Sequence, residues 1–163
     1  MLIAEARAGV LVIAPAGNRG SGRTCSPANY PGMIAVGATN NSDSVARFSG
    51  SELFKRAADF VKPNLAAPGV EIPSAKPGGG LQTRSGTSMA AAHVAGVAAL
   101  LFQAKPGATA AEVEEALLAT CEPLPESSEN RCGRGLVNPV KALEVILSTR
   151  RSYAGWRSTL TDA

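Results

Sequence analysis

One stretch of the sequence, residues 86–96, has the residue types of a nucleophilic site: Gly-Thr-Ser-Met-Ala-Ala-Ala-His-Val-Ala-Gly. Ser88 stands between a glycine-led turn and a run of small apolar residues that predicts a buried helix. The N-terminus of a helix presents unpaired backbone N–H groups and a partial positive charge. Acyl transfer needs a fixed nucleophile and donors for the developing oxyanion, so the stretch suits that chemistry. The structural alternative is that Ser88 is an ordinary N-cap residue.

The chain has a single histidine, His93, five residues after Ser88 on the same predicted helix. That spacing is about 1.4 turns and places the two side chains roughly 140° apart around the axis. We therefore do not expect His93 to act as the base for Ser88. Its neighbours Ala92, Val94 and Ala95 predict a buried, structural histidine instead.

Residues 86–96 closely resemble the nucleophile motif of the subtilisin-like serine proteases (subtilases). Four further blocks follow the order found in that family and resemble its oxyanion-hole block, the next strand, the segment before the nucleophile and the C-terminal signature. These blocks are Ala14–Gly20, Pro27–Ala38, Lys62–Val70 and Gly135–Asn138.

The resemblance implies a serine endopeptidase that works through an acyl-enzyme on Ser88, with Asn18 as the oxyanion donor. The alternative for Asn18 is a turn asparagine that tolerates a left-handed backbone. Subtilases place the triad aspartate and histidine before the oxyanion asparagine, whereas the only acid before Asn18 here is Glu5. We therefore expect the C-terminal half of a catalytic domain, inactive alone. The alternative is a non-catalytic fragment that docks with a separate N-terminal half.

The same alignment implies a substrate pocket formed by Ala16, Gly17, Arg19 and Cys25. Arg19 stands where the family often has an acid, so we expect it to favour acidic or to disfavour basic substrate side chains. No organic cofactor is implied, and peptides or proteins are the expected substrates.

In some relatives the carbonyl groups equivalent to those of Ala28, Tyr30 and Met33 hold a calcium or monovalent ion. The resemblance therefore allows a structural calcium or monovalent cation at these carbonyl groups in the complete domain. Cys121 and Cys132 flank a polar loop, and a disulfide between them is plausible, with two reduced thiols as the alternative. Cys25 is left over.

The apolar runs 10–14, 33–36 and 65–67 predict buried strands of a parallel sheet. Helices are predicted over 87–103, from Thr109 onward with a Thr109–Glu112 capping box, and over 140–147, while 5–8 resembles the last turn of another helix. Strands alternating with helices indicate an α/β fold, and the resemblance implies the three-layer subtilisin architecture, incomplete at the N-terminus. We expect a partial catalytic domain over 1–148 and a polar tail over 149–163.

The 163 residues carry a net charge of +3, with 18% charged and 4% aromatic residues. Without a basic stripe with interleaved aromatics we expect no nucleic-acid partner. The longest apolar run, 89–102, is shorter than the roughly 20 residues of a membrane span and contains His93, so no membrane segment is expected. No signal peptide is recognisable at the start. The resemblance places the parent enzyme outside the cell or in a secretory compartment.

Overall fold

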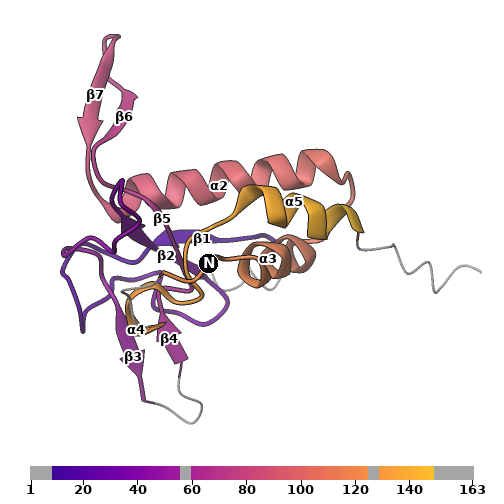
Figure 1. Cartoon of the computed structure of the whole chain (residues 1–163), viewed down its shortest axis with the longest axis horizontal. Helices are drawn as coiled ribbons and strands as arrows, with labels where there is room; N and C mark the ends of the chain where they lie inside the picture. Colours follow the sequence, from indigo (N-terminus) through magenta and orange to yellow (C-terminus); the bar gives the residue numbers. More distant parts are fainter. Residues whose placement is uncertain (1–8, 56–59, 125–128, 149–163) are drawn as a thin grey trace, which may run out of the picture.

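The computed structural model describes residues 9–55, 60–124 and 129–148. Its centre is a parallel sheet of three short strands in the order β1-β2-β5 (Figure 1). The strands are β1 (Ile13–Pro15), β2 (Ile34–Thr39) and β5 (Leu65–Pro68). Ile13 pairs with Ile34, and Val36 pairs with Leu65. Every residue of β2 is buried, as expected for a strand covered on both faces.

Two antiparallel hairpins accompany the sheet. One consists of β3 (Glu52–Phe54) and β4 (Phe60–Lys62), and the other of β6 (Ile72–Ala75) and β7 (Leu81–Arg84). The β6–β7 hairpin projects from the body of the molecule (Figure 1), and a turn rich in proline and glycine, residues 76–80, connects its strands. The sequence does not predict these four strands, because they are three or four residues long and mostly solvent-accessible.

Three of the helices are close to their predicted bounds, whereas the single turn at Glu129–Cys132 was not predicted. They are α2 (Thr87–Ala104), α3 (Ala110–Ala119), the single turn α4 (Glu129–Cys132) and α5 (Pro139–Ser148). The capping box of α3 is present: Thr109 Oγ1 accepts from the Glu112 backbone N–H, and the Glu112 carboxylate accepts from the Thr109 backbone N–H. Lys105 completes this corner with an ion pair of 2.8 Å to Glu112.

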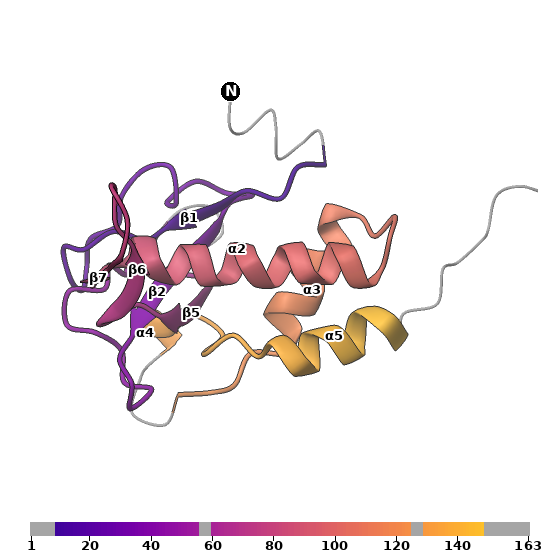
Figure 2. The same cartoon turned by 90° about the horizontal axis from the view of Figure 1, so that it is seen from above.

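One main core fills the space between the sheet and the helices. Alternate strand residues Ile34, Val36 and Leu65 face α2 together with Val94 and Leu101 of that helix. Helices α3 and α5 pack against each other beside α2 (Figure 2). The intervening strand residues belong to smaller clusters: Ala35 packs with Ala14 and Ala28, and Ala66 with Leu124 and Cys132. The α/β prediction, a parallel sheet flanked by helices, is therefore confirmed.

Some expectations change or cannot be followed. The predicted 10–14 strand is shorter and begins at Ile13. The helical turn predicted at 5–8 and the tail predicted at 149–163 lie outside the described residues. Among the residues that the structure describes, one helix, α2, is long and apolar enough to span a membrane. The core helices of many globular proteins share that property. One third of α2 is buried, and it packs on the sheet.

Candidate active site

The carboxyl ends of the parallel strands bring the two predicted functional segments together. Strand β1 leads into Ala16, Gly17 and Asn18, and β5 leads into Gly69. The Gly69 carbonyl accepts from the Gly86 backbone N–H at 2.7 Å and so fixes the start of α2. A Cβ at Gly69 would lie 2.7 Å from Ala38 Cβ and 2.9 Å from the Gly86 carbonyl oxygen. Only glycine permits this approach between strand and helix.

Thr87 joins the β1 loop to α2. Its side chain is fully buried, and both its backbone N–H and its hydroxyl donate to Asn18 Oδ1, at 2.9 and 3.0 Å. Its hydroxyl oxygen accepts from the Gly17 backbone N–H at 3.2 Å. The residue directly before Ser88 is thus hydrogen-bonded to Asn18 across 69 positions of sequence.

These bonds also orient the Asn18 amide. With Oδ1 held by Thr87, the donor atom Nδ2 lies over Gly86, 3.4 Å from the position that a Cβ would occupy there. A side-chain N–H is thereby presented beside the first turn of α2, where the helix contributes its own N–H groups. The arrangement suits an oxygen atom that gains negative charge.

Ser88 lies in the first turn of α2 and is exposed. The N-cap position belongs to Gly86, which has no side-chain cap, so the alternative of an N-cap role for Ser88 is wrong. Asn18 from the distant loop accepts the Thr87 N–H instead. The Ser88 hydroxyl is therefore held on a rigid helix and open to a ligand.

Three of the four residues predicted for the substrate pocket lie together, namely Ala16, Gly17 and Cys25. Ala16 is fully buried and its carbonyl accepts from the Cys25 backbone N–H at 3.0 Å. Gly17, at φ +103°, leaves no room for a side chain because a Cβ would lie 2.6 Å from Cys25 Sγ. Gly50 supports the same loop by donating to the Gly17 carbonyl at 2.7 Å. Arg19 is exposed.

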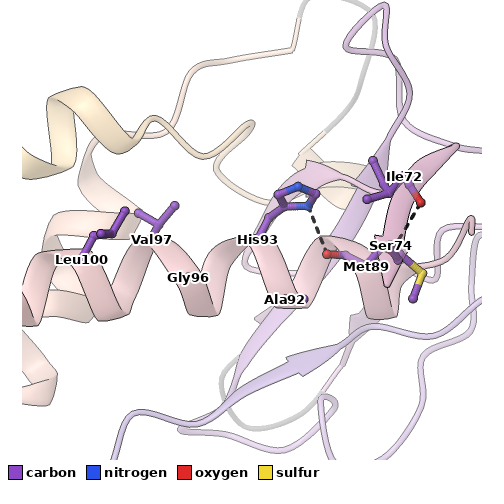
Figure 3. Close-up of a pocket in the computed structure, with 8 residues that line it drawn as sticks. All are labelled: Ile72, Ser74, Met89, Ala92, His93, Gly96, Val97 and Leu100. Carbon is purple, nitrogen blue, oxygen red and sulfur yellow. Dashed lines mark hydrogen bonds between the residues drawn. The ribbon is translucent and has the colours of Figure 1, made fainter. Parts of the chain in front are cut away.

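His93 is not buried, contrary to the prediction. It lies on the solvent side of α2, with Nδ1 3.1 Å from the Met89 carbonyl oxygen. Its ring borders an open apolar hollow of about 420 Å³, and Figure 3 shows the residues that line this hollow. The hollow is lined by Ile72, Ser74, Met89, Ala92, His93, Gly96, Val97 and Leu100. The small apolar residues around His93 predicted a buried helix, and this prediction is correct only for the face of α2 that packs on the sheet.

The cysteines do not form the plausible disulfide. Within the part of the chain that the structure describes, no disulfide joins Cys121 to Cys132. Cys121 Sγ donates instead to the Leu117 carbonyl, one turn back in α3, at 3.2 Å. Burial raises the pKa of the Cys121 thiol to about 11, so it stays protonated and unreactive at neutral pH.

The model of the subtilase family matches residues 2–135. The chain belongs to the subtilase family. Relatives include subtilisin E of Bacillus subtilis, 44% identical over 136 residues that cover 80% of this chain and 32% of subtilisin E. Bacillopeptidase F of the same species is 42% identical over 135 residues, covering 78% of this chain and 9% of the relative.

Solved structures agree with the subtilase assignment. The prenylagaramide maturation protease PagA superposes with a TM-score of 0.77 at 36% identity, over 89% of this chain and 54% of PagA. A mutant of the PatA protease domain gives 0.76 at 31% identity, over 90% and 51%. This subtilase chain thus spans about half of those structures and about a third of subtilisin E.

The sequence did not identify three residues that hold the segments containing Asn18 and Ser88 in place: Thr87, Gly69 and Gly50. Thr87 stands inside the recognised motif, yet nothing in the spacing shows that its hydroxyl reaches Asn18. The two glycines are recognisable only from the backbone atoms that approach them in the folded chain.

Proposed function

We propose that Ser88 is the nucleophile, and that Asn18 and the Ser88 backbone N–H are the oxyanion donors, of a subtilisin-like serine endopeptidase. The hydrogen bonds from Thr87 to Asn18 Oδ1 carry the proposal, because they hold the two segments in one site. Ser88 Oγ bonds to the carbonyl carbon of a peptide while a base removes its proton. The amine leaves with that proton, and water then hydrolyses the acyl-enzyme. No organic cofactor takes part.

The described residues provide no base for this step. His93 is the chain's single histidine, and it lies on another side of α2 from Ser88. The base and its orienting carboxylate must come from the part of the domain that relatives have and this chain does not match. We propose that residues 1–148 form a partial catalytic domain, with 149–163 as a tail, and that the isolated chain is inactive.

The substrate pocket that we propose is formed by the loop after β1, which also contains Asn18. Cys25 contacts Ala16 and Gly17, and Arg19 is exposed; we propose that the first three form the packed base of the pocket and that Arg19 lies at its rim. A guanidinium there attracts substrate carboxylates and repels ammonium groups. In a completed enzyme we expect substrates with Glu beside the cleaved bond to be cut faster than substrates with Lys, and a preference for Lys would contradict this role.

A fluorophosphonate probe tests the nucleophile. In the isolated chain we expect no more labelling than in Ser88→Ala, because the serine lacks a base; strong labelling at Ser88 would contradict the proposed inactivity.

A chimera in which this chain replaces the matching segment of subtilisin E supplies the base. In that chimera we expect labelling and peptide hydrolysis that Ser88→Ala abolishes and Asn18→Leu reduces through kcat. A folded chimera without Ser88-dependent labelling would contradict the catalytic assignment.

The second candidate is a non-catalytic half that docks with a separately made N-terminal half. The exposed side of α2 favours it, because an apolar hollow and the exposed Leu100 lie there without cover from the described residues. The outer edge of β1 is also unpaired within the described residues. Upstream DNA encoding the triad Asp and His in frame would instead identify a single longer protease.

A further inference from the structure

The loop before β2 contains the carbonyl groups that resemble a cation site. Ala28 and Met33 are buried, and Tyr30 is 44% exposed. The donor set does not fit a metal ion, because the Met33 carbonyl already accepts a hydrogen bond from Lys62 Nζ at 2.6 Å.

Lys62 is the unusual member of this group. It ends β4 and is only 3% exposed. Its ammonium also donates to Asn64 Oδ1 at 2.9 Å, and the same oxygen accepts from the Ala35 backbone N–H at 2.8 Å. The ion pairs among the described residues involve Lys105 and Lys141, not Lys62. The buried ammonium is therefore balanced by neutral oxygen atoms, as a coordinated metal ion would be.

The pKa of the Lys62 ammonium group is consistent with its burial. Burial lowers the pKa of Lys62 to about 8, and the more distant carboxylate of Glu114 acts in the opposite direction. The ammonium remains the dominant form at pH 7 and persists because its oxygen partners are fixed. Met33 is the last residue of the loop before β2, and Asn64 directly precedes β5. Because Lys62 at the end of β4 donates to both residues, it links β4, β5 and the 26–33 loop.

We propose that the ammonium group of Lys62 replaces the structural metal ion at the Met33 carbonyl, so that this subtilase is independent of calcium, sodium and potassium at that position. A metal ion bonded to the same carbonyl would meet a buried like charge at contact distance and is excluded. One other oxygen of the loop, Asn29 Oδ1, is buried without a hydrogen-bond partner in the described residues. A cation held there instead would make the wild-type chain cation-dependent.

Thermal unfolding of the full chain at pH 7 tests the proposal. The salts are choline chloride, NaCl, KCl and CaCl2 at equal ionic strength, after treatment with a chelator. We expect the wild-type midpoint to vary by less than about 1 °C among them. Lys62→Ala removes the charge and leaves space, so its midpoint in choline should fall by roughly 5 °C and recover saturably with a metal cation.

Lys62→Met removes the same charge but fills the space, so its midpoint should fall without recovery. Lys76→Met, an exposed lysine in the β6–β7 turn, is the control and should behave as wild type. A saturable rise of several degrees in the wild type with any of the metal cations would overturn the proposal, whether or not the variants fold. Equal cation responses of Lys62→Ala and Lys62→Met would overturn it as well.

Discussion

At the scale of single residues, Thr87 is what makes Ser88 and Asn18 one site. Its hydroxyl has one proton, which goes to Asn18 Oδ1, and its oxygen accepts the Gly17 N–H. Asn18, the proposed oxyanion donor, is thus oriented by the residue next to Ser88, the proposed nucleophile. Thr87 touches no reacting atom in this arrangement, so it is a positioning residue.

We predict that Thr87→Val lowers the free energy of unfolding by about 1–3 kcal/mol, because the part-buried Gly17 N–H and Asn18 Oδ1 each lose a partner at nearly constant side-chain volume. Urea unfolding measures the change. Thr39→Val is the matched control: Thr39 is also fully buried, but its hydroxyl oxygen has no partner among the described residues. That change should leave the free energy unchanged or raise it by up to about 1 kcal/mol. Equal losses in both variants would show that the Thr87 hydroxyl bonds do not matter.

The same scale shows where sequence reasoning succeeds and where it stops. Ser88 and Asn18 are recognisable because each stands in a local motif whose backbone constraints are visible in its neighbours. The bond between Asn18 and Thr87 spans 69 positions and depends on how the strands pair, which no local pattern reports. His93 was misplaced because its small neighbours gave no indication of which helix face meets the sheet. The disulfide suggested for Cys121 and Cys132 is absent from the structure. The spacing of two cysteines around a loop does not determine the direction in which their thiol groups point.

At the scale of elements, a close contact between β5 and α2 sets the position of Ser88, the proposed nucleophile. The strand ends at Pro68, and Gly69 lets the Gly86 backbone approach to hydrogen-bond distance. Long helices such as α2 and the capped α3 were predicted well because their signals extend over many residues. The hairpins were missed because three- or four-residue strands with exposed side chains carry little apolar periodicity.

We predict that Gly69→Ala lowers the free energy of unfolding by about 1–3 kcal/mol, since the added methyl group meets Ala38 Cβ and the Gly86 carbonyl. Gly96→Ala is the control, because a Cβ there meets no atom within 4 Å. Alanine in a helix interior should raise stability by roughly 0.5–1 kcal/mol. Opposite signs in urea unfolding support the close-contact argument, whereas a neutral Gly69→Ala would refute it.

At the scale of the whole molecule, α2 is buried on one side only. Val94, Ala98 and Leu101 face the sheet, whereas Leu100 is 62% exposed and borders the apolar hollow. The helix is apolar on both sides, so its composition suits a core helix covered all round. The described chain leaves that second side in water, where an apolar surface tends to associate.

We therefore predict that the isolated chain self-associates through the solvent side of α2, and that Leu100→Lys reduces the association. Light scattering coupled to gel filtration should give a mass above the monomer value of 16.6 kDa that rises with concentration, and the variant should shift towards the monomer. Leu81→Lys is a demanding control, because Leu81 is 76% exposed, more than Leu100, but lies on the projecting β6–β7 hairpin (Figure 1). If general exposed hydrophobicity drove association, Leu81→Lys would have the larger effect. If the uncovered helix side drives association, Leu100→Lys will have the larger effect.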